Sequence, residues 1–343
     1  MGLQSDSYYM RRALAVARRG AGLASPNPMV GACLVKDRKI ISYGYHAKFG
    51  AEHAEVMALK SARKCAQGAT LYVTLEPCNH QGKTPPCTEA ILAAGISRVV
   101  CAMRDPNTQV LGRGVERLEQ AGIEVKLGVL EAEARRLNEF WCYHQATGLP
   151  FVILKVALSA DAKVGLRGEG KTPISGTVSM RHLHGIRSRV DAILVGGSTV
   201  IADDPLLSNR RLGAKHMEWQ PKRVVLQGSQ LIDRQRQIFN TPNLGEVIVY
   251  SEKDHTHLDL RAVLKDLGAR GMTSVLVEAG PKLFDAVFNA QLFQRLLVYS
   301  SPKILGPDGI NLGCRVEEIQ RNQEFKSDSR RLGADSLIRV ERK

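Results

Sequence analysis

Two successive blocks of strand-like runs separated by helix-like stretches constrain the fold of this chain more than any other feature. In the first block, runs typical of β-strands alternate with patterns typical of helices: strands at 30–35, 40–45, 71–75 and 99–103, and helices at 7–19, 52–62, 88–94 and 131–146. Strands that alternate with helices are typical of α/β layer sandwiches. The pattern therefore predicts an α/β fold for the first block.

The segment Thr147-Gly148-Leu149-Pro150 separates the two blocks. Glycine and proline interrupt regular structure, so we place a domain boundary there, with domains at 1–147 and 148–343. A length of 343 residues agrees with two domains. The second block has the same alternation and predicts a second α/β domain: strands at 151–158, 192–195, 224–226, 247–250, 274–277, 296–299 and 337–340, helices at 177–189, 258–268 and 281–290, and a loop at 208–222.

The first block contains a spacing typical of a catalytic zinc site. His53-Ala54-Glu55 is followed by Pro77-Cys78 and Pro86-Cys87. One histidine and two cysteines supply three ligands, and a catalytic zinc ion keeps its fourth position for water. A glutamate two residues after the histidine, itself not a ligand, can move protons between that water and a substrate. The pattern predicts His53, Cys78 and Cys87 as zinc ligands and Glu55 as the catalytic residue of a deaminase.

Two other interpretations of these residues stay open at this point. His80 would complete a closed structural zinc site, and isolated histidines and cysteines are often packing residues. The residues between Cys78 and Cys87 predict a loop at the mouth of a pocket, where His80 and Lys83 would meet an anionic group. Asn27 is expected either near a substrate or in a turn. Packing roles are expected for the other cysteines: Cys33, Cys65, Cys101, Cys142 and Cys314.

Four segments of the first block resemble the deaminase half of the bifunctional riboflavin-biosynthesis deaminase/reductase family. They are PNPMVGACLV, GYHAKFGAEHAEVMAL, ATLYVTLEPCNHQGKTPPCTEAILAAGISRVV and DPNTQVLGRGVERLEQAGIEV. The resemblance covers nearly all of 7–145 and implies a cytidine-deaminase-like α/β/α domain. It implies deamination of the 2-amino group of 2,5-diamino-6-ribosylamino-4(3H)-pyrimidinone 5′-phosphate. It also implies substrate contacts by Asn27, His46, His80 and Lys83.

The second block carries weaker signals. Gly196-Gly197-Ser198-Thr199 and Gly280-Pro281-Lys282-Leu283 each follow a strand. A tight glycine turn before a helix suits a phosphate group. Neither segment matches the GxGxxG fingerprint of dinucleotide-binding folds, so these residues alone leave open a simple chain connection. Arg187 and Arg210 are candidates for a phosphate clamp, or else solvated surface residues.

Four segments of the second block resemble the reductase half of the same family, which is similar in fold to dihydrofolate reductase. They are VILKVALSADAKVG, DAILVGGSTVIADDPLLSNR, SVLVEAGPKLFDAVF and LLVYSSPKILG. The resemblance implies NADPH-dependent reduction of a ribosyl group to ribityl. It implies NADPH contacts by Ala157, Thr199, Asp203, Gly228, Gly280, Pro281, Lys282 and Leu283. It implies substrate contacts by Thr172, Arg187, Leu207, Arg210 and Glu278.

Three departures from the family pattern bear on this half. Where the family usually has Ser-Leu-Asp-Gly, the chain has Ser159-Ala160-Asp161-Ala162, so a tight turn is expected to change. The usual Gly-x-Ser-x-Trp-Ile segment is one residue shorter and has Pro173 without the tryptophan. Gln227-Gly228 stands in place of Asp-Ser. These changes sustain one alternative, a deaminase with a catalytically silent second domain. We expect an active reductase because Arg187, Arg210 and Glu278 are present.

The net charge of +14 favours a partner that carries negative charge. The absence of a run of five basic residues disfavours a nucleic-acid arm, and the long loop between Cys78 and Cys87 disfavours the alternative of a tRNA base deaminase. No apolar run reaches the ~18–20 residues that span a bilayer. Seven cysteines in a chain of this size favour a reducing compartment. We therefore expect a cytoplasmic enzyme with a phosphorylated pyrimidine substrate, bound to neither nucleic acid nor membrane. A homo-oligomer is compatible with such folds.

Overall fold

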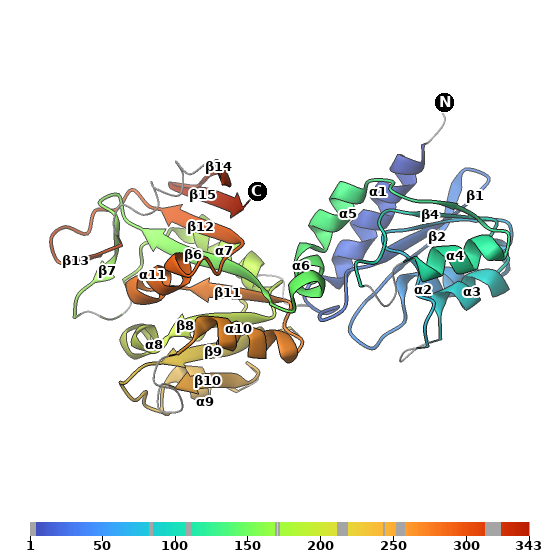
Figure 1. The fold of residues 1–343 in the computed structure, drawn as a ribbon. Coiled ribbons are helices and arrows are strands. Elements are labelled where there is room, and N and C mark those ends of the chain that lie inside the picture. Colours follow the sequence, from blue (N-terminus) through green and yellow to red (C-terminus); the bar gives the residue numbers. More distant parts are fainter. Residues whose placement is uncertain are drawn as a thin grey trace. The chain divides into compact units, whose positions relative to one another are not determined.

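The computed structural model describes residues 5–81, 85–107, 112–168, 170, 172–210, 219–242, 244–251, 258–312 and 324–342. The chain forms two compact units, Met1–Gly148 and Leu149–Lys343 (Figure 1). Among the described residues, no helix combines the length and the apolar character that crossing a membrane requires. Lys83 and Cys314, which the sequence analysis singled out, lie outside the described residues.

The first unit is a three-layer α/β/α sandwich around one five-stranded sheet, in the order β2-β1-β3-β4-β5. Strands β2, β1 and β3 are antiparallel neighbours, whereas β3, β4 and β5 run parallel. Its elements are α1 Asp6–Ala17, η1 Arg18–Gly20, β1 Gly31–Lys36, β2 Lys39–Tyr45, α2 Ala54–Ala62, η2 Arg63–Ala66, β3 Thr70–Val73, α3 Cys87–Ala93, β4 Arg98–Cys101, α4 Arg113–Gln120, β5 Glu124–Lys126, α5 Glu131–Leu137 and α6 Glu139–Thr147.

Alternation of side chains along the central strands explains the two helical layers. In β1, Ala32 and Leu34 pack against α2, α3 and α4, while Cys33 and Val35 pack against α1, α5 and α6. Successive side chains of a strand point to opposite faces, so a strand buried on both faces becomes an almost continuous apolar run. The sandwich follows from this pattern and confirms the predicted α/β class.

The predicted helix at 131–146 is wrong in one respect, because two helices, α5 and α6, occupy this stretch. The break falls at Asn138, which is buried. The Asn138 amide accepts a hydrogen bond from Met29 N at 2.8 Å and donates one to Met29 O at 3.0 Å. Pairing with a distant backbone satisfies these buried groups and competes with helix continuation.

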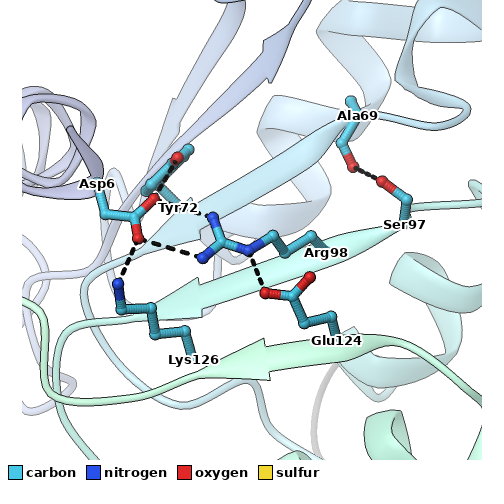
Figure 2. Close-up of polar contacts among 7 residues, drawn as sticks. All are labelled: Asp6, Ala69, Tyr72, Ser97, Arg98, Glu124 and Lys126. Atoms are coloured by element: carbon cyan, nitrogen blue, oxygen red, sulfur yellow. Dashed lines mark hydrogen bonds and ion pairs between the residues drawn. The ribbon is translucent and has the colours of Figure 1, made fainter. Parts of the chain in front are cut away.

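An ion-pair network ties the start of α1 to the parallel strands (Figure 2). The Asp6 carboxylate accepts hydrogen bonds from Tyr72 Oη at 2.8 Å, Arg98 Nη1 at 2.9 Å and Lys126 Nζ at 2.8 Å. Arg98 Nε also donates to Glu124 at 2.6 Å. The Arg98 guanidinium, more than the other partners, holds the pKa of Asp6 well below its usual range.

The second unit is built on an eight-stranded sheet, in the order β10-β9-β8-β11-β6-β12-β15-β14, in which β15 pairs antiparallel with both β12 and β14 and the other neighbouring strands run parallel. A two-stranded sheet pairs β13 with β7. The elements are β6 Phe151–Leu158, β7 Lys163–Leu166, α7 Thr177–Arg187, β8 Ala192–Gly196, α8 Gly197–Asp203, β9 Lys222–Gln227, α9 Gln237–Asn240, β10 Val247–Ser251, α10 Leu260–Ala269, β11 Ser274–Glu278, α11 Pro281–Asn289, β12 Arg295–Ser300, β13 Gly309–Asn311, β14 Phe325–Leu332 and β15 Asp335–Arg342.

The large sheet is covered on both faces. Helices α10 and α11 pack against one face through a core that includes Val152, Leu154 and Val277. Helix α7 contacts the opposite face, where its Arg187 pairs with Glu278 of β11 and its His182 bonds Tyr299 of β12. Parallel strands have both faces covered in this way, which explains the apolar runs in the sequence.

Candidate functional site

Three potential metal ligands of the first unit converge on one point. The ligand atoms of His53, Cys78 and Cys87 all lie within 4.8 Å of one another. His53 directly precedes α2, Cys87 is the first residue of α3, and Cys78 lies in the segment between β3 and α3. His53 Nδ1 is 3.2 Å from Cys87 Sγ and 3.5 Å from Cys78 Sγ. The ring therefore presents Nδ1 to both sulfur atoms.

The surroundings of the two cysteines favour a thiolate at Cys78. Interaction with the Cys87 side chain lowers the pKa of Cys78 below its usual value, and the same interaction raises the pKa of Cys87. Cys87 N also donates to Cys78 Sγ at 3.4 Å. Metal binding replaces thiol protons, and one imidazole with two thiolates is a donor set that zinc prefers. The residues present thus fit zinc.

His80 is not part of this cluster among the described residues. The described residues therefore do not form the structural zinc site with four protein ligands that the sequence allowed. A cluster of three ligands leaves one coordination position for another molecule, which distinguishes catalytic from structural zinc sites.

Glu55 lies beside the cluster on the first turn of α2 and is 3% exposed. Burial raises the pKa of its carboxyl group to about 7. Glu55 lies two residues beyond His53 in the sequence, and it is not one of the three clustered ligands. A buried carboxyl group at this place can accept and donate protons inside the cavity.

Asn27 and His46 form an oriented pair in the same cavity. His46 Nδ1 lies 3.1 Å from the carbonyl oxygen of Glu52, and His46 Nε2 lies 3.1 Å from Asn27 Nδ2. A carbonyl oxygen only accepts, so Nδ1 carries the proton and Nε2 accepts from the Asn27 amide. Burial lowers the pKa of His46, which favours this neutral form. The Asn27 side chain therefore has a fixed amide orientation.

A cavity of about 450 Å³ is lined by two members of the cluster, His53 and Cys78, together with Glu55, Asn27, His46 and His80. Residues that the sequence analysis did not single out also line it: Phe49, Asp105, Asn107, Trp141, His144 and Gln145. Asp105 and Asn107 belong to the Asp-Pro-Asn segment after β4, which could have been suspected from its place at a strand end. No local signal identifies the residues of α6, because a helix face carries no motif of this kind.

Of the cysteines outside the cluster, Cys33 and Cys101 are buried and Cys142 is half-buried. The expected packing role is wrong for Cys65, which is exposed on the short helix η2.

In the second unit, the two predicted glycine turns lie next to each other. Gly196 ends β8 and Gly197 begins α8, Gly280 directly precedes α11, and β8 and β11 are adjacent parallel strands. A methyl group added to Gly280 would lie 3.4 Å from Thr199 Oγ1. Gly228 follows β9, the next strand of the sheet. In open α/β sheets, ligands bind at the carboxyl edge of the strands, where these residues gather.

Arg187 and Glu278 form a buried ion pair beside this edge. Arg187 Nε and Nη2 donate to the two carboxylate oxygens at 2.7 and 2.9 Å, and Nη1 donates to Ser208 O at 3.2 Å. Burial raises the pKa of Glu278, but the guanidinium outweighs it and the pKa lies below its usual value. Arg210 is exposed, and its backbone N–H donates to His184 Nδ1 at 3.2 Å.

The other predicted residues of this unit have different surroundings. Ala157 lies in β6, and Asp203 is the last residue of α8. Thr172 Oγ1 accepts a hydrogen bond from Leu166 N at 3.2 Å. Leu207 is buried and has a positive φ of 50°. Pro281, Lys282 and Leu283 form the first turn of α11.

The turn that lacks the family's glycine is closed in spite of the substitution. Ala162 N donates to Ser159 O at 3.0 Å, and Ala162 adopts a φ of 59°. The turn therefore keeps its shape. What changes is its strain, because alanine adopts the left-handed conformation only at a cost in energy. Asp161 links this turn to Leu305 N at 3.1 Å and Gly306 N at 2.8 Å.

Comparison with known proteins agrees with both units. A family model described as the cytidine and deoxycytidylate deaminase zinc-binding region matches residues 3–103, and one described as the RibD C-terminal domain matches residues 150–335. The chain is 38% identical to the riboflavin biosynthesis protein RibD of Escherichia coli, with 98% of this chain and 99% of that protein covered. It is also 38% identical to RibD of Aquifex aeolicus, with 97% of each covered.

Solved structures give the same result. The RibD structure of Acinetobacter baumannii matches with a TM-score of 0.89 at 35% identity, over 98% of this chain and 99% of that one. The structure of a diaminohydroxyphosphoribosylaminopyrimidine deaminase/5-amino-6-(5-phosphoribosylamino)uracil reductase from Thermotoga maritima matches with a TM-score of 0.87, at the same identity and coverage.

The fold and the three-ligand cluster define a zinc-dependent deaminase that carries a second, reductase-type α/β unit. The chain belongs to the RibD family of riboflavin biosynthesis proteins, which makes it a bifunctional deaminase and reductase.

Proposed function

We propose that the chain catalyses two consecutive steps of riboflavin biosynthesis. In the first step, the 2-amino group of 2,5-diamino-6-ribosylamino-4(3H)-pyrimidinone 5′-phosphate is replaced by oxygen and leaves as ammonia. In the second step, NADPH reduces the ribosyl group of the product to ribityl. The observation that carries this proposal is the cluster of His53, Cys78 and Cys87 with Glu55 beside it, at one cavity of a chain that covers 99% of its RibD relative from Escherichia coli.

His53 Nδ1 and the two cysteine thiolates would hold zinc in the first unit. When bound, zinc supplies the Lewis acidity that makes a water molecule nucleophilic near neutral pH. Glu55 takes the proton that this water loses and delivers protons to the pyrimidine ring nitrogen and the departing amine. Its burial in the same cavity keeps competing bulk water away from these transfers.

Asn27 and His46 orient the substrate ring in this proposal. His46 accepts one N–H of the Asn27 amide, so Asn27 presents its carbonyl oxygen and its second N–H in a fixed order. A pyrimidinone offers a matching N–H and C=O pair along one edge. His80 lies in the cavity, and we propose it for the phosphate together with Lys83.

NADPH would be held at the carboxyl edge of the second sheet. We propose contacts by Ala157, Thr199, Asp203, Gly228 and the 280–283 turn, and NADPH supplies the hydride when bound. We propose substrate contacts by Thr172, Arg187, Leu207, Arg210 and Glu278. Because Arg187 uses three of its N–H groups on Glu278 and Ser208, it keeps the Glu278 carboxylate ionised and oriented, while exposed Arg210 is the better candidate for the phosphate.

Metal analysis of the purified protein tests the zinc assignment. We expect stoichiometric zinc in the unaltered chain and a clear loss of zinc in Cys87→Ser, because a serine hydroxyl is a much poorer zinc ligand than a thiolate. Cys101→Ser, which removes a buried thiol outside the cluster, is the matched control and should retain zinc. Unchanged stoichiometry in Cys87→Ser would contradict the three-ligand site.

We also propose a cytoplasmic location, which the use of cysteines as metal ligands supports, since such thiols need a reducing compartment. Oligomeric assembly stays a prediction that sedimentation of the purified chain would test. Family membership over nearly the full length favours the two-step enzyme over a tRNA base deaminase or a deaminase with a silent second domain.

A further inference from the structure

Glu76 is a buried carboxylate with an unusual set of partners. It is 3% exposed and lies two residues before Cys78. Its Oε1 accepts hydrogen bonds from Gly114 N at 3.1 Å and Val115 N at 3.2 Å, and its Oε2 accepts from Asp105 N at 3.3 Å and Gly112 N at 3.2 Å. The side chain thus serves four backbone N–H groups, and the described contacts give it no cationic partner.

Three of these four donors belong to the start of α4. The first N–H groups of a helix have no partner within the helix, and a carboxylate is the strongest acceptor for them. Here the carboxylate comes from a segment more than 35 residues earlier in the chain. Glu76 therefore caps α4 and also connects the segment that leads to Cys78 to this helix by hydrogen bonds.

Gly114 extends the same contact to the next residue. A Cβ atom at Gly114 would lie 1.9 Å from the carbonyl oxygen of Pro77. Only glycine lets the helix and the Pro77 carbonyl approach this closely, because real Cβ atoms keep well beyond 3.0 Å from such an oxygen. Helix α4 and the 76–77 backbone are thus packed in direct contact.

The other side of the segment is fixed by α3. Thr88 N donates to Cys78 O at 3.3 Å, and Thr88 Oγ1 donates to Asn79 Oδ1 at 2.8 Å. Asn79 Nδ2 returns to α4 by donating to Arg113 O at 3.2 Å. Residues 76–79 are therefore held between the beginnings of two helices, and the Cys78 sulfur is carried by this clamped segment.

We propose that Glu76 is a positioning residue for Cys78, whose hydrogen bonds to α4 set the affinity of the three-ligand cluster for zinc. The inference rests on the proposed role of Cys78 as a zinc ligand. Removing the carboxylate leaves four buried N–H groups without their acceptor and frees the backbone before Cys78. A sulfur atom that is no longer held at the cluster must be ordered when metal binds, which weakens binding.

The experiment is a zinc competition titration with a chromophoric chelator on the full chain carrying Glu76→Gln or Glu76→Ala. We expect the dissociation constant for zinc to rise by about 10–100-fold, the range for residues that orient metal ligands. Glu76→Gln keeps one acceptor oxygen, so its loss of zinc affinity should be smaller than that of Glu76→Ala. Cobalt(II) absorption in the thiolate charge-transfer region should weaken in the same order, and this signal reports the bonds from Cys78 and Cys87 to the metal.

Glu89→Gln is the matched control. Glu89 also joins α3 to α4, through Arg117 at 3.1 Å, but its side chain is 53% exposed. The control should bind zinc like the unaltered chain. Thermal unfolding followed by circular dichroism checks that the first unit of each variant is folded, because reduction of the deaminated intermediate by NADPH reports only the second unit.

Gly114→Ala provides a second route to the same test if a Glu76 variant does not fold. It should also lower zinc affinity, by displacing Pro77, with the carboxylate intact. Folded Glu76 and Gly114 variants with zinc affinity within twofold of the unaltered chain would overturn the inference. Absence of zinc from the unaltered chain would instead refute the proposed zinc site itself, so the two failures are distinguishable.

Discussion

At the residue scale, Glu55 and the three clustered ligands divide the chemistry of the first unit between them. The ligand atoms lie within 4.8 Å of one another, and Glu55 is buried beside them without belonging to the cluster. Metal binding and proton transfer are therefore assigned to different side chains, and a single substitution can separate the two.

Glu55→Gln should retain zinc and lose deamination. The glutamine side chain has the same shape but cannot accept and return a proton, so ammonia release should fall by at least about 10²-fold, the usual contribution of general acid–base catalysis. Metal analysis and an ammonia assay on the same preparation provide the measurement. Reduction of the deaminated intermediate should be unaffected. Loss of zinc together with activity would show that Glu55 acts as a ligand or supports one.

The cluster residues could be predicted from the sequence because each lies in a short local motif. His53 and Glu55 are two residues apart, and Cys78 and Cys87 each follow a proline at the start of a new segment. Trp141 and His144 line the same cavity without any such signal, because only the tertiary fold brings α6 to it. The role of Glu76 could not be predicted for the same reason, since its hydrogen-bond partners lie 29 to 39 residues away in the sequence.

At the element scale, long periodic segments were predictable and short or interrupted ones were not. The apolar run of β6 and the helical spacing of α7 and α11 are read directly from the chain. The break between α5 and α6 depends on Asn138 bonding the backbone of Met29, which lies 109 residues away. Strand β14 is exposed along most of its length, so it carries no apolar pattern to identify it.

The turn between β6 and β7 provides a prediction about backbone strain. Ala162→Gly should stabilise the protein by about 0.5–1 kcal/mol, because glycine adopts the positive φ without strain and part of that gain is offset by a more flexible unfolded chain. Chemical denaturation measures the change. Ala160→Gly in the same turn is the control and should destabilise, since Ala160 is not among the residues with positive φ. Equal effects of both substitutions would contradict the strain.

The attachment of α1 to its sheet provides a prediction about pH. The pKa of Asp6 in the folded protein lies below its ordinary value of 3.8, so the ionised carboxylate contributes stability above about pH 4 that is lost as the pH falls toward the folded pKa. Asp6→Asn should destabilise by about 1.5–3 kcal/mol at pH 7, the range for hydrogen bonds to charged groups, and by less at pH 3.

Urea denaturation of both proteins at the two pH values gives the comparison. Glu124→Gln is the control: it removes another carboxylate from Arg98, but one that is 68% exposed, and it should change stability little (Figure 2). A difference between Asp6→Asn and the unaltered chain that does not depend on pH would refute the linkage.

At the scale of the whole molecule, the two activities differ in how far the sequence specifies them. The zinc cluster draws on two short segments, whereas the carboxyl edge of the second sheet draws on β6, β8, β9 and β11, which are distant in the chain and adjacent only in the sheet. Single glycine turns such as that at Gly280 are common connections. They indicate a binding site only in the folded chain. There, Thr199 and Gly280 lie together beside the buried pair of Arg187 and Glu278.

The most direct test of the account is a coupled assay on the full, zinc-loaded chain. It receives the diaminopyrimidinone ribosyl phosphate with or without NADPH, and ammonia release and NADPH oxidation are followed separately. We predict ammonia in both conditions and NADPH oxidation only after deamination has begun. Ammonia release without any NADPH oxidation, or no ammonia at all, would contradict a chain in which both units work in sequence.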